Sequence, residues 1–141
     1  IIMSDKEKFE GFLTKLVDDN EQKYGKEIRE KYGDETVDRS SAKFLNMSRE
    51  QYTELERLTN ELNETLKLAV ESGDPGGELA RKACELHKKW LCFYWDEYSK
   101  EAHIGVTQMY VDDSRFTAYY EKIAPGCAAF LRNAVAIYCR Q

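Results

Sequence analysis

The chain has 141 residues, of which 42% are hydrophobic and 33% charged, and its net charge is −5. This balance fits one globular domain with a single core and excludes a disordered chain. The acidic charge argues against direct binding of nucleic acid, and no apolar run is long enough to span a membrane. The start, Ile1-Ile2-Met3, is typical of a truncated chain rather than a signal peptide, so we expect the natural chain to begin upstream.

The first third of the chain predicts helices with few apolar anchors. Ser4 and Glu7 form a capping box that opens a first helix, and a short second helix is expected over residues 26–32, ending at Gly33. Residues 17–43 are rich in charge and are expected to be the least stable part of the fold. The loop between Gly33 and Asn46 is expected to be the longest of the chain.

The middle of the chain shows a clear helical stripe. Ser48 and Gln51 form a second capping box, and Gly73 ends that helix before an Asp-Pro-Gly-Gly turn. The next helix is expected to bend between Trp95 and Ser99. The apolar positions that define the two stripes are Tyr52, Leu55, Leu58 or Thr59, Leu62, Leu66 and Ala69, and then Leu79, Ala83, Leu86, Trp90 and Phe93 or Tyr94.

Three further helices complete the prediction. The first carries Ala102 and Val106 and ends at Asp112-Asp113, the second begins at Ser114, and the last has Pro125 near its first position. Sustained strand alternation is absent from the sequence. We therefore predict an all-α bundle of five to seven helices in a single domain spanning residues 1–141, with residues 1–46 as a mobile N-terminal lid and residues 47–141 as the helical core.

The cysteines do not suggest zinc or disulfides. Cys84, Cys92, Cys127 and Cys139 form no C-x-x-C pair, so mostly buried thiols in a reducing cytosol are the favoured interpretation. Cys127 lies best for activation, in the first turn of a helix, but packing at a tight helix contact is the more ordinary explanation.

The two histidines, His87 and His103, leave open the hypothesis of a bound cofactor. Each could ligate haem or a metal, although single helix histidines are usually half buried and hydrogen-bonded to a neighbour. Glu97, Glu101 and His103 could form an acid–base group. Without a nucleophile nearby, we predict no enzyme activity, no catalytic residue, no cofactor and no metal.

Aromatic residues crowd the last third of the chain beyond what its core requires. Trp90, Met109, Phe130 and Leu131 fall on inner stripes, and at least two of the rings between Phe93 and Tyr98 are expected to be accessible. The rings are Trp90, Phe93, Tyr94, Trp95, Tyr98, Tyr110, Phe116, Tyr119, Tyr120, Phe130 and Tyr138. Such a surplus is typical of a binding surface.

The segments QMYVDDSRFT (108–117) and IAPGCAAFLRNA (123–134) resemble the signature blocks of the TipAS antibiotic-recognition domain. The Tyr24-Gly25 and Lys31-Tyr32-Gly33 segments are similar to the N-terminal motif of this family. The resemblance implies an all-helical, globin-like fold without haem, a cleft for bulky antibiotics, and an N-terminal segment that ligand orders. The chain departs from the family in two respects. Residues 98–105 hold no cysteine for covalent capture of a thiopeptide, and Trp90 and Trp95 enlarge the aromatic lining, which suggests a flat, apolar ligand instead.

The leading hypothesis is a cytoplasmic, ligand-sensing effector domain of a MerR-type transcriptional regulator that binds apolar or aromatic antibiotic-like compounds. DNA would be bound only through an upstream domain absent from this chain, no membrane is involved, and the full-length regulator would allow a homodimer. The alternative is a stand-alone drug-sequestering resistance protein; a haem or metal enzyme is a third hypothesis. The predicted ligand-binding residues are Trp90, Phe93, Tyr94, Glu97, Tyr98, His103, Val106, Met109, Tyr110 and Tyr119.

Overall fold

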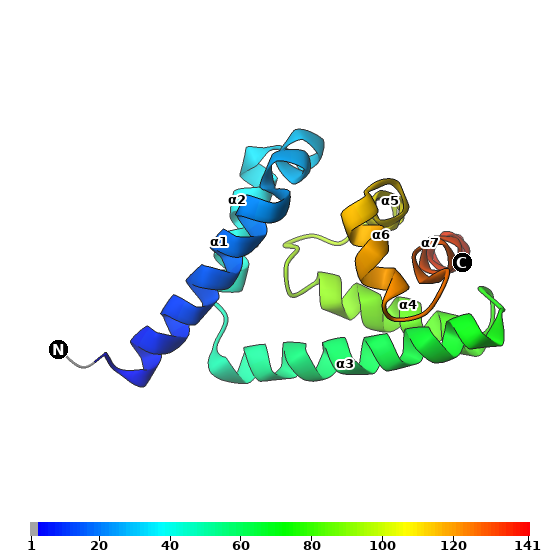
Figure 1. Ribbon diagram of the computed structural model, residues 1–141, viewed down its shortest axis with the longest axis horizontal. Coiled ribbons are helices and arrows are strands. Elements are labelled where there is room, and N and C mark those ends of the chain that lie inside the picture. Colours follow the sequence, from blue (N-terminus) through cyan, green and yellow to red (C-terminus); the bar gives the residue numbers. More distant parts are fainter. Residues whose placement is uncertain (1–2) are drawn as a thin grey trace. The chain divides into compact units, whose positions relative to one another are not determined.

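The structure is a computed structural model and describes residues 3–141; Ile1 and Ile2, on which the interpretation of the chain start depends, lie outside the described residues. Over this range the chain forms seven helices and no strand, which confirms the predicted all-α class (Figure 1). The chain divides into two compact units. The N-terminal unit comprises residues 3–54 and 93–96, and the C-terminal unit comprises residues 55–92 and 97–141.

The N-terminal unit begins with α1 (Asp5–Tyr32) and α2 (Asp34–Leu45), which pack side by side. The capping box is confirmed, because the Ser4 side chain accepts a hydrogen bond from the Glu7 N–H at 3.2 Å. Two predictions are wrong here. α1 continues without a break through residues 17–32, and the expected loop after Gly33 is helical. The charged residues at the start of α2 stabilise it, since acidic side chains at a helix N-terminus offset the helix dipole.

Charge and aromatic rings hold this unit together. Arg29 of α1 pairs with Glu21 in its own helix and with Asp34 and Asp38 of α2. The Gly33 backbone, at a φ of 84°, allows the sharp turn between the two helices. Further along, the ring of Phe44 stacks on Tyr94 with 5.7 Å between centroids. An edge-on cluster joins the rings of Phe9, Phe12 and Tyr52.

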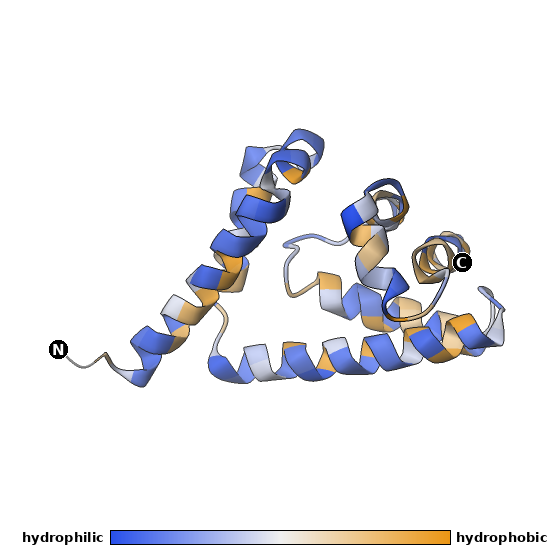
Figure 2. Ribbon diagram, viewed as in Figure 1, coloured by the Kyte–Doolittle hydropathy of each residue, from blue (hydrophilic) through white to orange (hydrophobic). Residues whose placement is uncertain are grey.

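α3 (Arg49–Ser72) begins in the N-terminal unit and continues into the C-terminal unit. The Ser48–Gln51 capping box is present at its start, with the Gln51 N–H donating to Ser48 Oγ at 3.1 Å. The predicted stripe is largely confirmed, because Leu55, Leu58, Leu62, Leu66 and Ala69 are all buried. Apolar residues recur along α3 between polar ones (Figure 2). This spacing leaves one face of the helix for packing and the other for solvent.

The rest of the C-terminal unit consists of α4 (Glu78–Leu91), α5 (Lys100–Asp112), α6 (Ser114–Glu121) and α7 (Cys127–Tyr138). α7 packs against α4, α5 and α6, and a Lys82–Glu61 ion pair links α4 to α3. The predicted turn after α3 is confirmed by Gly73, whose φ is 70°. The predicted break before α5 is present, but α4 already ends at Leu91, so the prediction that Phe93 or Tyr94 continues this helix is wrong.

The start of the last helix is displaced by two residues from the prediction. Pro125 lies before α7, and Gly126 is the N-cap in a left-handed conformation with a φ of 80°. Proline therefore restricts the turn rather than the first helical residue. Small residues follow at once: Cys127, Ala128 and Ala134 are almost fully buried, so α7 can approach its neighbours closely.

Candidate functional site

The two histidines meet inside the C-terminal unit. His87 comes from α4 and His103 from α5, and His87 Nδ1 lies 2.8 Å from His103 Nε2. Their rings are nearly parallel, with centroids 5.0 Å apart. Neither side chain has any exposed surface. The prediction of half-buried histidines is therefore wrong in degree, while the expected hydrogen bond to a neighbour is present.

A tyrosine continues the hydrogen bonding at each end of the histidine pair. The hydroxyl of Tyr110 lies 3.2 Å from His87 Nε2, and the hydroxyl of Tyr98 lies 2.7 Å from His103 Nδ1. Beyond them, the ring of Tyr120 packs against that of Tyr110, and the Tyr98 hydroxyl lies 4.0 Å from the Sγ atom of Cys139. We call the series Tyr110–His87–His103–Tyr98, with Cys139 at its outer end, the tyrosine–histidine chain.

Both imidazoles in the tyrosine–histidine chain are neutral at physiological pH. Burial, followed by the charge that His103 would carry, lowers the pKa of His87 well below its ordinary value. Burial and the nearby Lys88 ammonium lower the pKa of His103 to about 4. Burial also raises the pKa of Tyr98 and of Tyr120 above the ordinary phenol value. All the members therefore act as neutral hydrogen-bonding groups.

The geometry disfavours a metal or a haem between the histidines. Zinc–nitrogen bonds are about 2.0 Å long, so a gap of 2.8 Å between the facing nitrogens leaves no room for an ion. Over residues 3–141 no group of three or more histidine, cysteine or acidic side chains could hold a metal. The other ring nitrogens, His87 Nε2 and His103 Nδ1, face tyrosine hydroxyls.

The suggested acid–base group does not assemble around His103. Its Nε2 faces His87 and its Nδ1 faces Tyr98, so neither Glu97 nor Glu101 bonds to the imidazole. Both carboxylates belong to exposed residues, as the surface-charge interpretation predicts.

Two of the cysteines have little nucleophilic character. Burial raises the pKa of Cys84 and of Cys127 to about 12, so the helix N-terminus does not activate Cys127. Three of the four thiols are buried, which confirms the expectation that they are mostly buried, and Cys92 is exposed. None of the four cysteines, which all lie in the described range, forms a disulfide.

A network of rings extends outward from the tyrosine–histidine chain. Trp90 stacks on His87 at 5.7 Å, and Tyr120 lies 4.5 Å from Tyr110 between ring centroids. Tyr119 then meets Tyr120 edge-on at 5.0 Å. Trp90 is half-buried, and Tyr119 keeps 47% of its surface exposed. The network therefore begins and ends at side chains that solvent can reach.

The predicted ligand-binding residues divide between the units. Phe93 and Tyr94 belong to the N-terminal unit, and the other eight belong to the C-terminal unit. Among those eight, the tyrosine–histidine chain and its ring network bring together Trp90, Tyr98, His103, Tyr110 and Tyr119. Val106 is buried, Met109 is half-buried and Glu97 is exposed.

The predicted accessibility of the aromatic residues agrees with the structure in part. Phe93, Tyr94, Trp95 and Tyr98 are all half-buried, so at least two are accessible as expected. Of the residues assigned to the core, Leu131 is fully buried, whereas Trp90, Met109 and Phe130 are half-buried.

Sequence reasoning missed the pairing of the histidines. A usable signal was present in the register. His87 stands four residues after Ala83 and four before Leu91, and all three are buried on the same face of α4. His103 precedes Val106 and Tyr110 by three and seven residues on α5 in the same manner. Two buried histidines in one small unit favour mutual hydrogen bonding, because buried polar groups need partners.

The chain belongs to the TipAS antibiotic-recognition domain family, whose model matches residues 24–138. This confirms the resemblance found in the signature blocks. The globin-like arrangement is consistent with the seven helices.

The similar proteins are transcription regulators by name. The chain is 29% identical over 137 residues to the HTH-type transcriptional activator TipA of Streptomyces coelicolor, covering 96% of the chain and 53% of TipA. It is 24% identical to the HTH-type transcriptional activator mta of Bacillus subtilis (97% and 53%) and 26% identical to the HTH-type transcriptional regulator SkgA of Caulobacter vibrioides (98% and 54%). The chain thus spans about half the length of these relatives.

No solved structure matches the chain. Within residues 3–141, none of the helices combines the length and the apolar character that crossing a membrane requires.

Proposed function

We propose that this chain is the ligand-sensing effector domain of a MerR-type transcriptional regulator. Its ligand would be a bulky apolar or aromatic, antibiotic-like compound. The family match supports recognition of such compounds, and the names of the relatives support a regulatory role. DNA would be bound by a helix-turn-helix domain upstream of this chain, in the cytoplasm, and the whole regulator would act as a homodimer.

The observation that carries the proposal is the ring network of the C-terminal unit. It presents a half-buried Trp90 at one end and an exposed Tyr119 at the other, joined through buried rings whose positions are fixed by hydrogen bonds. A preorganised aromatic surface loses little freedom when it binds a flat compound. Covering apolar ring surface then contributes about 25 cal/mol per Å².

The full set of proposed ligand contacts adds the two N-terminal-unit rings Phe93 and Tyr94 and the side chains of Glu97, Val106 and Met109. In this proposal the first 46 residues fold over the bound compound as a lid. The few buried residues in α1, Leu13 and Gly25, support a low local stability for that segment. Ordering it would link ligand binding to a change that the upstream domain can sense.

A fluorescence titration tests the proposal. In a Trp95→Phe background, Trp90 is the only tryptophan, so its emission reports directly on the proposed surface. We expect at least one member of a panel of flat aromatic antibiotics to change this emission saturably. Tyr119→Ala should then weaken its binding about five- to tenfold, the effect of about 1–1.4 kcal/mol expected for a ring contact.

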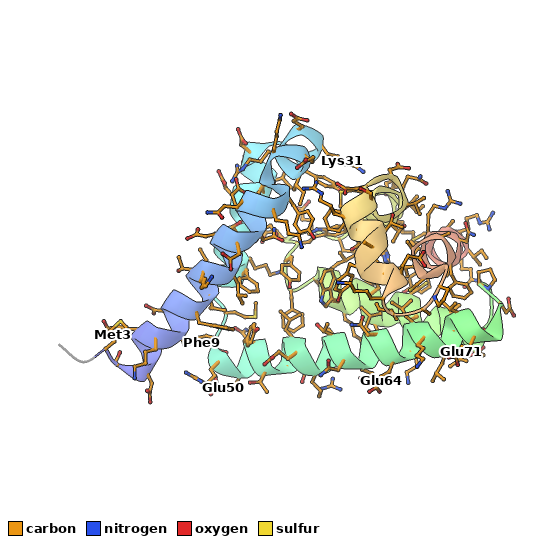
Figure 3. All side chains as sticks on the ribbon, in the orientation of Figure 1. Met3, Phe9, Lys31, Glu50, Glu64 and Glu71 are labelled. Carbon is orange, nitrogen blue, oxygen red and sulfur yellow. The ribbon has the colours of Figure 1, made fainter. Side chains whose placement is uncertain are left out.

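Leu68→Ala is the matched control, because it removes an apolar side chain that is 52% exposed on a different surface. Leu68 lies on α3 between Glu64 and Glu71, which are labelled in Figure 3 and are both exposed. The Leu68→Ala substitution should leave the affinity for the compound unchanged. Equal losses for Tyr119→Ala and Leu68→Ala, or no response to any compound, would refute the proposed surface.

A stand-alone drug-sequestering protein is the alternative. The coding sequence upstream of Ile1 separates the two: a helix-turn-helix followed by a long dimerising helix means a regulator, and a start codon there means a sequestering protein.

A further inference from the structure

Lys88 differs from the other cationic residues of α4 in where its charge lies. It directly follows the buried His87 and stands four residues after the buried Cys84, so its aliphatic stem borders the packed face of the helix. Lys88 is half-buried, whereas its neighbour Lys89 is exposed. The Nζ atom of Lys88 lies 4.4 Å from the centre of the Tyr98 ring.

The Lys88 ammonium has no acidic partner in the part of the chain that the structure describes. Glu85, three residues before it on the same helix, pairs instead with Arg81 at 3.8 Å. A ring face attracts an ammonium weakly, whereas a carboxylate accepts its N–H donors in charge-assisted hydrogen bonds. The half-buried charge of Lys88 is therefore compensated by a ring alone, and an added anion would stabilise it further.

The ring beneath this ammonium belongs to the candidate site. The Tyr98 hydroxyl lies 2.7 Å from His103 Nδ1, and the two rings meet edge-on with 5.4 Å between centroids. The charge of Lys88 also acts on the interior, because burial and this ammonium together lower the pKa of His103 to about 4. The tyrosine–histidine chain thus carries a positive charge at its Tyr98 end.

We propose that Lys88 is a specificity residue that binds a carboxylate on the ligand, while the rings of the ligand lie on the aromatic surface. The ligand is then an aromatic acid that is ionised at neutral pH. A lysine ammonium is a compact point charge, so it pairs with a carboxylate without requiring one fixed orientation. This assignment rests on the proposed ligand-binding function and names the chemical class of the ligand.

The acidic net charge of the chain, −5, does not oppose such a ligand. Exposed charges separated by more than about 8 Å are largely screened at physiological ionic strength. Lys88 acts on the ligand at contact distance, and partly buried charges are screened less than exposed ones. The charge at the site therefore decides which ligands bind, rather than the charge of the whole chain.

Equilibrium dialysis of the chain against 2-naphthoate and 2-naphthamide tests this inference. The two compounds share one fused ring system and are nearly equal in size, but only 2-naphthoate is charged at neutral pH. We expect 2-naphthoate to bind about five- to tenfold more tightly at low ionic strength, the factor expected for one partly exposed charged pair. Adding salt should reduce this preference, because salt screens the pair.

Three variants assign the preference to one residue. Lys88→Met keeps an unbranched stem without the charge and should abolish the preference for 2-naphthoate. Lys88→Arg keeps the charge and should retain most of it. Lys89→Met is the matched control, because it changes the net charge by the same amount at an exposed neighbouring position, and it should preserve the preference.

The outcomes distinguish this inference from the proposed function. Equal binding of the two compounds, or a preference that survives Lys88→Met, would overturn the role of Lys88 while leaving the aromatic surface intact. Equal losses in Lys88→Met and Lys89→Met would also overturn it, because the charge of the whole chain would then set the preference. Failure of both compounds to bind would overturn the role of Lys88, and the Trp90 titration with the antibiotic panel would decide the aromatic surface separately.

Discussion

Acidification should destabilise the C-terminal unit through its two buried histidines. In the folded unit the pKa of His103 is lowered to about 4, and the pKa of His87 also lies well below its ordinary value. In the unfolded chain both return to about 6.5. Between these values the unfolded state binds more protons than the folded state. The free energy of unfolding therefore falls as the pH is lowered through this window.

The size of the effect follows from proton linkage. For His103, with a pKa of about 4 folded and about 6.5 unfolded, lowering the pH from about 7 to about 5 removes about 2 kcal/mol of stability. His87 is equally buried and shifts in the same direction, so the pair should contribute more than His103 alone. This is a large share of the 5–15 kcal/mol that is typical of a folded domain.

Urea unfolding at a series of pH values measures this dependence. In the Trp95→Phe background, the emission of Trp90 reports on the C-terminal unit, because Trp90 stacks on His87. Many carboxylates also titrate towards pH 5, so the informative quantity is the difference between this protein and the same protein with His87→Gln and His103→Gln. The stability of the glutamine variant should fall less over the two pH units, by at least about 2 kcal/mol.

Parallel curves for the two proteins would refute the reasoning. A direct check covers the case in which the glutamine variant does not fold. Imidazole proton shifts of the unsubstituted chain should stay constant down to about pH 5, because neither ring gains a proton there. A ring that titrates near its ordinary pKa would show that it is not held in the neutral form by burial.

Three further predictions concern core packing, helix capping and the accessibility of the cysteines. Leu66→Ala, at a fully buried position of α3, should cost about 2–5 kcal/mol in urea unfolding, whereas Leu68→Ala at an exposed one should stay within about 0.5 kcal/mol. Ser4→Ala should remove about 1 kcal/mol of α1 stability and speed amide exchange in the first turn; unchanged exchange would contradict the observed capping box. Under native conditions iodoacetamide should label the exposed Cys92 well before Cys84, whose pKa is about 12, as peptide mass analysis would show.

Much of the helical architecture could be predicted from the sequence because local chemistry specifies it. Capping boxes at Ser4 and Ser48 and the glycine stop at Gly73 depend on residues a few positions apart. The errors arose where tertiary contacts decide the outcome. Residues 17–32 look weakly helical in isolation, yet Arg29 connects them to α2 by ion pairs with Asp34 and Asp38. Helix propensity predicts helix formation poorly where such tertiary contacts are present.

For the candidate site, the sequence predicts which residue types are present but not which side chains meet. The surplus of rings and the family signature could be recognised in the chain itself, and the family assignment is confirmed. The contact between His87 and His103 spans sixteen residues and depends on how α4 and α5 pack, which no spacing rule supplies. The contact between the rings of Tyr110 and Tyr120 depends in the same manner on the packing of α6 against α5.

The position of the tyrosine–histidine chain explains how a stable interior can serve a binding surface. Buried polar groups cost free energy unless every one is satisfied, and they then specify a single arrangement of the helices that carry them. Tyr110, 3% exposed, forms the inner end of the chain by its hydrogen bond to His87. Tyr98, half-buried, lies at the other end. The chain therefore joins side chains of α4 and α5 inside the unit to a tyrosine that solvent can reach, so the groups that satisfy one another in the interior also hold one ring of the proposed surface in place.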